Sequence, residues 1–337
     1  MQKSDLSFSY PEHLVATERA AVSRVMCVRG GEPSEVTLSH ILTEIGPDDL
    51  LVINETQVLP ARVFSLCGIE VLFIKSLNPL HWQVLTPMRR WPKSQVLVLP
   101  EGVEARISQG GLPQVVELSS PLSETYFDQH GDVPLPPYIH EARGEKHSRL
   151  IDKEAYQTSW AKIKGSLAAP TASLHFSIED LERIKKRGAQ VQTLCLHVGL
   201  GTFLPIHSHN LSEHRMHHEW VSVPKATWSA VQECRQSGGR VWCLGSTVTR
   251  ALESQALGLF QETDEAWVGE TDLFIRPGFE FRATDVLMTN FHQPESTLIA
   301  MVMAFSSPQI VLDCYNWAIE RQFRLFSYGD LSVWQKK

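Results

Sequence analysis

The 337-residue sequence has no apolar run long enough to cross a membrane. Its longest apolar segment, Leu298 to Phe305, falls well short of the ~20 residues that a transmembrane helix needs. The opening stretch, Met1 to His13, also lacks the basic residues and apolar run of a secretory signal. These absences predict a cytoplasmic protein without a membrane partner.

Cysteine is scarce and widely spaced. The six cysteines are Cys27, Cys67, Cys195, Cys234, Cys243 and Cys314, and no two form a C-x-x-C pair. This spacing argues against a disulfide framework and against a thiolate zinc site, so we expect buried thiols. The sequence also lacks the G-x-S-x-G turn of serine hydrolases and the phosphate-binding P-loop, which removes both of those enzyme classes.

An excess of basic charge is missing too. The 31 lysines and arginines are outnumbered by 38 acidic residues, which gives a formal net charge of -7. A general nucleic-acid coat is therefore excluded, because phosphate binding requires a basic face. Two local clusters remain, and each is more typical of a solvated surface than of a binding patch: Arg183, Lys185, Lys186 and Arg187, and Arg143, Lys146, His147, Arg149 and Lys153.

Between Val63 and Ser119 short apolar runs alternate with turn residues such as Gly110-Gly111, and no helical period is present. This pattern predicts a small antiparallel β-barrel or sandwich. Trp82 and Trp91 in this stretch flank two arginines, so they are either core residues or a face on which RNA bases stack.

Outside that stretch, helix, glycine and strand signals alternate, which indicates an α/β fold. The expected helices begin at Leu38, Ser177, Pro224 and Ser307, and the expected strands are Leu50 to Ile53, Val191 to His197, Arg240 to Leu244 and Phe323 to Phe326. We therefore predict a larger discontinuous α/β domain formed by residues 1–62 and 150–337, with a small antiparallel β-barrel domain, residues 63–149, inserted into it.

Polar residues and glycines follow two of the predicted strands. In open α/β sheets, ligands bind beyond the carboxyl ends of the strands. Glycines there let a ligand approach the backbone, and the start of a helix with hydroxyls and an arginine suits a carboxylate or phosphate. An ordinary tight turn and simple helix capping explain the same residues, which are His197, Gly199, Gly201 and Thr202 after one strand and Gly245, Ser246, Thr247 and Arg250 after the other.

Five histidines lie between His207 and His218, directly before Glu219. His214 and His217 or His218 would share a face if this segment were helical, a spacing known from metal sites. The order H-x-x-H-H-E differs from the H-E-x-x-H of zinc enzymes, so an acid/base pair of His217 and Glu219 is favoured over a metal.

Two further segments place polar side chains between apolar flanks. The first contains Thr171 and His175, and the second contains Asn290 and His292. Each segment is either part of a site or an ordinary capped loop.

Together, ordered motifs along nearly the whole chain resemble the S-adenosylmethionine:tRNA ribosyltransferase-isomerase family of queuosine biosynthesis. The resemblance lies in NETQVLPAR (54–62), LPPYI (135–139), YQT (156–158), AAPTASLHF (168–176), LHVGLGTF (196–203), HRMHHE (214–219), GSTVTRALES (245–254), GETDLFI (269–275), TNFHQPESTL (289–298) and FSYGD (326–330).

This resemblance implies transfer and isomerisation of the ribosyl part of S-adenosylmethionine. The acceptor is 7-aminomethyl-7-deazaguanine at the tRNA wobble position, and the products are epoxyqueuosine-tRNA, adenine and methionine. S-adenosylmethionine is then a co-substrate, and neither a further cofactor nor a metal is expected. The implied fold is a small β-barrel inserted into a larger α/β domain, and the oligomeric state is left open.

The resemblance also implies roles for individual residues. Glu219 and His217 are expected to do acid/base work, with His175 and His292 as further catalytic residues in contact with base or ribose. The expected substrate-binding residues are Thr171, His197, Gly199, Gly201, Thr202, Gly245, Ser246, Thr247, Arg250, Glu270, Thr271, Asn290, Tyr328 and Asp330.

Some positions depart from the family pattern: Gln57, Ser173, Gln293, Glu295 and Leu325. The family usually has an arginine at position 57 and a lysine at position 295, so attraction to tRNA phosphates is expected to be weaker. An alternative is therefore a non-catalytic or repurposed relative that binds S-adenosylmethionine or RNA. A third interpretation is a histidine-rich metal hydrolase on an unrelated α/β fold.

Overall fold

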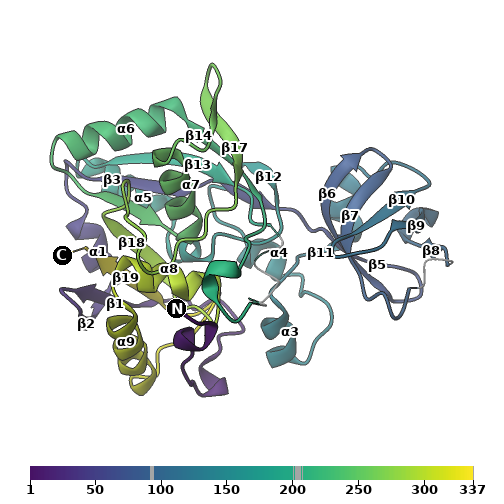
Figure 1. Cartoon of the computed structure of the whole chain (residues 1–337), viewed down its shortest axis with the longest axis horizontal. Helices are drawn as coiled ribbons and strands as arrows, with labels where there is room; N and C mark the ends of the chain where they lie inside the picture. The colour runs from purple at the N-terminus through teal and green to yellow at the C-terminus, as the bar shows by residue number, and fades with distance from the viewer. Residues whose placement is uncertain (92–94, 200, 202–205, 207, 337) are drawn as a thin grey trace. The chain divides into compact units, whose positions relative to one another are not determined.

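The computed structural model describes residues 1–91, 95–199, 201, 206 and 208–336 (Figure 1). The chain divides into two compact units, each assembled from separate stretches of sequence. The first unit comprises Met1–Gln57, Gln157–Ile163 and Ala169–Lys337, and the second comprises Val58–Tyr156 and Lys164–Ala168. The predicted α/β class is confirmed: the structure is mixed α/β, with a large sheet and a curled antiparallel sheet.

A ten-stranded sheet forms the centre of the first unit within the described residues. Its order is β16-β17-β14-β13-β3-β15-β18-β19-β1-β2. The strands are β1 (Arg24–Arg29), β2 (Glu32–Thr37), β3 (Leu50–Asn54), β13 (Gln190–Leu196), β14 (Glu219–Pro224), β15 (Val241–Leu244), β16 (Gln261–Glu262), β17 (Ala266–Thr271), β18 (Val286–Asn290) and β19 (Leu331–Gln335).

The middle of this sheet is parallel. β13, β3, β15 and β18 are neighbours and run in the same direction. Every residue of β3, β15 and β18 is buried, as expected for strands covered on both faces. On one face Leu51 and Trp242 join a core with residues of two helices, α1 (Leu38–Glu44) and α5 (Ile178–Lys186).

The helices of the first unit begin and end largely where the sequence predicts. Ser177 caps α5 through a hydrogen bond to the backbone of Asp180, and Ser307 caps α9. No single helix in the described part has both the length and the apolar character to span a membrane; only α8 and α9 taken together do, with a 110° bend between them. The remaining helices are α6 (Lys225–Gln236), α7 (Ser246–Ala256), α8 (Thr297–Phe305) and α9 (Pro308–Glu320), with the short 3-10 helices η1 (Lys3–Leu6), η2 (Glu12–Leu14), η4 (Thr171–His175) and η6 (Leu211–Glu213).

The second unit contains a curled antiparallel sheet in the order β11-β5-β6-β7-β10-β9-β8. Trp91 is fully buried and is a core residue, whereas Trp82 is half-buried and packs edge-on against Phe73. The elements are β5 (Arg62–Phe64), β6 (Glu70–Asn78), β7 (His81–Leu85), β8 (Leu97–Val98), β9 (Glu104–Gln109), β10 (Gln114–Leu118), β11 (Gly131–Asp132), α2 (Glu124–His130), α3 (Pro137–Arg143), α4 (Asp152–Ala155) and η3 (Pro100–Gly102); β4 (Thr56–Val58) and β12 (Ile163–Ser166) form a separate two-stranded sheet.

The predicted strand Phe323 to Phe326 is wrong. Gln322 and Phe326 have φ angles of 58° and 72°, so the chain turns at both ends of this segment. Within this segment Leu325 makes an isolated bridge to Val15. The strand that joins the large sheet in this part of the chain is β19.

Three other expectations are corrected. The histidine segment 214–218 is not helical, because it runs in extended form from η6 into β14. Cys67 is exposed, whereas the other five cysteines are buried as predicted. Arg143 is not part of a solvated face, since it forms a buried ion pair with Asp152.

Candidate active site

The carboxyl ends of the parallel strands meet at one edge of the large sheet. β13 ends before His197, β3 ends at Asn54, β15 ends before Gly245 and β18 ends at Asn290. Because these four strands are adjacent and parallel, the residues that follow them lie side by side. The predicted convergence of the strand-end loops is therefore present in the structure.

Antiparallel neighbours bring more candidates to the same edge. Glu219 opens β14 and lies opposite Thr271, the last residue of β17. Leu331 opens β19 and lies opposite Asn290, so Tyr328 and Asp330 come just before that pairing.

Asn54 holds three of these segments together. Its fully buried carboxamide donates to the carbonyl of Leu196 at 3.0 Å and to Oγ1 of Thr247 at 3.2 Å. Its Oδ1 accepts hydrogen bonds from the backbone N–H groups of Thr56 at 3.0 Å and Leu196 at 3.2 Å. The ends of β3 and β13 are thereby fixed to the first turn of α7.

His197 lies beside this anchor. Its Nδ1 is 2.7 Å from Oγ1 of Thr56, and its ring stacks on Trp220 at a centroid distance of 4.9 Å. Burial lowers the pKa of His197 to about 4. The imidazole is therefore neutral near pH 7 and acts as a hydrogen-bonding group.

His175 belongs to a hydrogen-bonded chain at the end of β18. Oγ1 of Thr171 donates to Oδ1 of Asn290 at 2.9 Å, and Nδ2 of Asn290 lies 3.0 Å from Nε2 of His175. Nδ1 of His175 lies 2.6 Å from Oγ of Ser23. Since the amide nitrogen donates to Nε2, the ring hydrogen sits on Nδ1 and points to Ser23.

The charge state of His175 agrees with this chain. Burial, together with the charges of Arg19 and Arg324, lowers the pKa of His175 to about 3. His175 is thus a neutral ring with both nitrogens engaged.

His292 is the third buried histidine at this edge. Its Nε2 is 2.8 Å from Oγ1 of Thr289, and its backbone N–H donates to the hydroxyl of Tyr315 at 3.0 Å. Burial lowers the pKa of His292 to about 3. None of these three histidines carries the charge that an acid catalyst near neutral pH would need.

Glu219 forms a buried ion pair with Arg250. One carboxylate oxygen accepts from Nη1 of Arg250, and the other accepts from the backbone N–H of Gly199 at 2.8 Å. Both side chains are nearly inaccessible, with exposed fractions of 5% for Glu219 and 7% for Arg250. The side chain of Glu219 is therefore held in place, with each carboxylate oxygen accepting a hydrogen bond.

The first turn of α7 lies between these groups. Gly245 has a φ angle of 103°, a backbone conformation that favours glycine, and it turns the chain from β15 into the helix. Ser246 and Thr247 follow as the first helical residues and are half-buried. Their backbone N–H groups lie at the positive end of the helix dipole.

Some candidates have a structural role in the fold. The carboxylate of Asp330 accepts from the backbone N–H groups of Arg24 at 3.0 Å and Arg324 at 2.7 Å, and burial raises the pKa of this carboxyl. Oγ1 of Thr271 lies 2.6 Å from Oγ of Ser254 on α7. Both side chains thus connect segments of this edge.

The other candidates are placed as follows. Tyr328 is buried next to Asp330, and Glu270 is exposed, because alternate residues of a strand face opposite sides. His217 is half-buried near Gly201, and Thr202 lies outside the described residues. In the part of the chain that is described, no three histidine, cysteine, aspartate or glutamate side chains gather in a way that could hold a metal ion.

Sequence reasoning missed Asn54, Ser23 and Thr56. Asn54 directly ends a buried strand, which is the same signal that identified His197 and Gly245. Ser23 and Thr56 give no such signal, since only the folded chain brings them to a histidine ring.

Comparisons with known proteins cover almost the whole chain. Residues 3–333 match the family model described as "Queuosine biosynthesis protein". A protein of Geotalea uraniireducens named S-adenosylmethionine:tRNA ribosyltransferase-isomerase is 40% identical over 345 residues, covering 98% of each chain. A protein of the same name from Coxiella burnetii is 38% identical, covering 97% of this chain and 96% of its own.

A solved structure is similar as well. The crystal structure of the S-adenosylmethionine tRNA ribosyltransferase from Thermotoga maritima matches with a TM-score of 0.55 and 28% identity, covering 98% of this chain and 100% of the other. The names of these relatives support a catalytic function and not a non-catalytic one.

Proposed function

The chain belongs to the family of queuosine biosynthesis proteins, the S-adenosylmethionine:tRNA ribosyltransferase-isomerases, and from this premise we propose how its residues carry out the reaction. The enzyme moves the ribosyl part of S-adenosylmethionine to 7-aminomethyl-7-deazaguanine at the tRNA wobble position. Epoxyqueuosine-tRNA forms, and adenine and methionine leave.

The observation that carries this proposal is the convergence at one sheet edge. Glu219, His197, Gly245 and Asn290 come from distant parts of the sequence, yet the strand pairing brings them together. We assign the reaction to this edge of the first unit, as a discontinuous catalytic α/β domain. We assign the second unit as an inserted β-barrel domain. Consistent with these substrates, we place the enzyme in the cytoplasm, with tRNA and S-adenosylmethionine as its partners and no other cofactor.

The reaction needs a group that takes a proton activated by the sulfonium. Of the expected pair, Glu219 has both oxygens engaged by Gly199 and Arg250. We therefore assign proton transfer to His217, because its half-buried imidazole lies near Gly201 and an imidazole can both accept and donate a proton. Glu219 then supports this step by holding the guanidinium of Arg250 in place.

A neutral histidine with an unengaged ring nitrogen suits recognition of ribose hydroxyls and of the leaving adenine. Thr171 and Asn290 fix the ring of His175, while Thr56 fixes that of His197. Such rings hold reactants in place without a net charge, and correct placement of reactants supplies a large part of rate acceleration. We assign this positioning of base or ribose to His197 and His292, each of which has one ring nitrogen in a hydrogen bond described above, and to His175 through Asn290, because both nitrogens of His175 are engaged.

The proposed function is tested with purified protein, S-adenosylmethionine and tRNA that carries 7-aminomethyl-7-deazaguanine. Chromatography should detect free adenine, and mass spectrometry should detect added mass on the wobble base. Absence of both products, while a known family member is active in parallel, would contradict the function.

The role of His217 is tested by substitution, with its exposed neighbour His218 as the matched control. His217→Gln should reduce kcat by about 100-fold or more, since general acid/base groups contribute about 10²–10⁴-fold. His218→Gln should leave kcat near the wild-type value, because His218 is exposed. A His217→Gln enzyme with normal kcat would remove His217 from catalysis and leave the family function in place.

A further inference from the structure

One donor at the candidate site has no partner. Nη1 of Arg250 donates to Glu219, and Nε donates to the carbonyl of Leu273 at 3.2 Å. Nη2 of Arg250 is buried, and no hydrogen bond acceptor contacts it in the described chain. Arg250 is only 6% exposed, so any acceptor for Nη2 has to enter a confined space.

A buried guanidinium N–H without an acceptor is costly, and such groups in proteins normally have a partner. Glu219 does not supply it: its carboxylate accepts from Nη1 of Arg250 and from the backbone N–H of Gly199, and Nη2 makes no hydrogen bond to it. The free Nη2 therefore indicates an acceptor that arrives from outside the chain.

The surroundings of Arg250 favour an anionic acceptor. Arg250 lies three residues after Thr247 and four after Ser246 on α7, and helical side chains lean toward the N-terminus of their helix. The first-turn N–H groups of α7 add positive potential at the same end. Oγ1 of Thr247 accepts from Asn54, which leaves its own hydrogen available for donation.

We propose that Nη2 of Arg250 binds the methionyl carboxylate of S-adenosylmethionine and that Glu219 is a positioning residue that holds the guanidinium for this contact. The inference rests on the proposed function and refines it. A tRNA phosphate has the same chemistry, but a phosphodiester within an RNA chain cannot reach a donor that is more than nine-tenths buried. A carboxylate at the end of a small molecule can.

The test compares two ligands by isothermal titration calorimetry on the full-length protein. One ligand is S-adenosylmethionine, and the other is decarboxylated S-adenosylmethionine, which lacks only the carboxylate. Wild-type protein should bind the first about 10- to 100-fold more tightly, the range expected for a hydrogen bond between charged groups. Arg250→Gln should bind both ligands with equal affinity.

Two further variants separate a loss of ligand binding from a loss of stability. Arg250→Gln leaves Glu219 buried without its partner, which destabilises the fold. The double variant Arg250→Gln/Glu219→Gln removes both charges and should also lose the preference, with a melting temperature closer to wild type. Arg235→Gln is the matched control, because Arg235 on α6 pairs with Asp285 at the opposite edge of the sheet; it should keep the full preference.

A folded Arg250→Gln or double variant that still prefers S-adenosylmethionine would overturn the inference. An equal loss of affinity for both ligands in these variants would also overturn it. A loss of tRNA affinity with the ligand preference intact would overturn it as well and would identify a phosphate contact. Wild-type protein that releases adenine but shows no preference would overturn this inference alone. Wild-type protein that neither binds S-adenosylmethionine nor releases adenine would overturn the proposed function as well.

Discussion

Gly199 and Glu219 lie in direct contact at the edge of the large sheet. The backbone N–H of Gly199 donates to Oε1 of Glu219 at 2.8 Å, and a Cβ at position 199 would lie 3.3 Å from Cγ of Glu219. Glu219 is buried and paired with Arg250, so a displacement of its side chain would disturb the ion pair. A side chain at Gly199, the first glycine of the Gly199-Leu-Gly201 sequence, would therefore press against this ion pair.

Gly199→Ala should raise the KM for S-adenosylmethionine about tenfold, because overpacking by one methyl group displaces Glu219 and, with it, Arg250. Gly46→Ala is the matched control: its Cβ would lie 3.9 Å from Oδ2 of Asp49, an ordinary contact before the amino end of β3. Steady-state kinetics of the two variants check this. Equal KM values for Gly199→Ala and wild type would show that the ion pair tolerates displacement.

Stability should depend on pH through the buried histidines. Burial lowers the pKa of His197 to about 4 and that of His292 to about 3, and burial with nearby arginines lowers that of His175 to about 3. An unfolded histidine titrates near pH ~6.5, so between these values the unfolded chain binds more protons than the native one. The free energy of unfolding should therefore fall as the pH drops from about 6.5 toward 4.

The size of this dependence is predictable. Each histidine contributes up to about 1.4 kcal/mol per pH unit within its window. Urea unfolding at several pH values measures the sum, and His197→Gln should lower the slope by about one proton. His218→Gln serves as the exposed control and should leave the slope unchanged. A slope that His197→Gln does not alter would mean that His197 is protonated in the native state.

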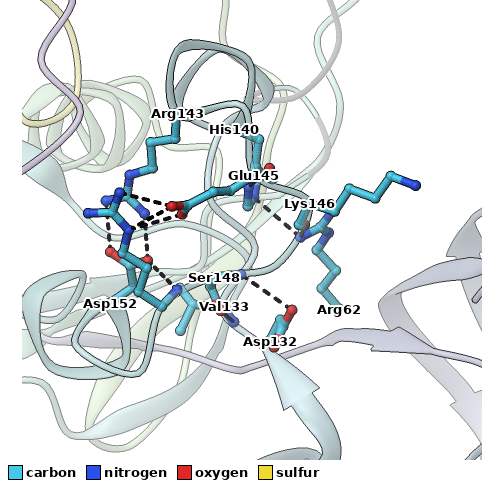
Figure 2. A network of polar contacts seen from close by, with 10 residues as sticks. Arg62, Asp132, Val133, His140, Arg143, Glu145, Lys146, Ser148 and Asp152 are labelled. Carbon is cyan, nitrogen blue, oxygen red and sulfur yellow. Dashed lines mark hydrogen bonds and ion pairs between the residues drawn. The ribbon is translucent and has the colours of Figure 1, made fainter.

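The second unit contains a polar network around Asp152 (Figure 2). Arg143 donates to both carboxylate oxygens of Asp152, at 2.7 and 3.0 Å, and the backbone N–H of Arg149 donates to one of them at 2.7 Å. The side chains of Arg143 and Asp152 are 3% and 2% exposed. Loss of one partner would leave the other charge buried and uncompensated.

Asp152→Asn should therefore lower the free energy of unfolding by about 3–5 kcal/mol. The control is Glu182→Gln on α5, which removes an exposed pair with Lys185 and should change stability by less than about 1 kcal/mol. Chemical denaturation of both variants measures the difference. Similar values for the two would show that the Asp152 pair is as weak as a surface pair.

Local signals in the sequence predicted much of the first unit. The serine before α5, with an aspartate three residues later, gave the correct helix start, and continuous apolar runs gave β3 and β15. The strand-end loops were correctly expected to converge, since parallel strands share one carboxyl edge. The prediction of a strand at 323–326 was wrong, because non-glycine residues with left-handed backbone conformations bound this strand-like stretch.

The chemistry of the site was harder to predict. The pairing of Glu219 with Arg250 joins residues from β14 and α7, and no local pattern reports it. In this pairing both carboxylate oxygens of the expected base accept hydrogen bonds. The low pKa values of the histidines likewise follow from burial, which is a property of the folded chain.

Glu295 is one of the positions that the resemblance led us to expect as a lysine, and the structure gives it a neighbour of opposite charge. Oε2 of Glu295 lies 3.1 Å from Nζ of Lys3, and the backbone N–H of Glu295 donates to the carbonyl of Leu6 at 3.1 Å. Both charged side chains are partly exposed, so their attraction contributes less than about 1 kcal/mol. The acidic residue is thus locally neutralised, and the segment that follows His292 is held by the N-terminal residues.

Glu295→Lys should therefore alter stability little but change the electrostatics of tRNA binding. It replaces a neutral pair with two cations, so the dependence of tRNA affinity on salt should steepen by about one unit on a log–log plot if the bound tRNA passes this surface. Lys3→Glu/Glu295→Lys restores a neutral pair and should return the slope to the wild-type value. Filter binding across a salt series measures all three proteins. An unchanged slope in Glu295→Lys would mean that tRNA does not approach position 295, and the departure from the family pattern would then have no bearing on tRNA affinity.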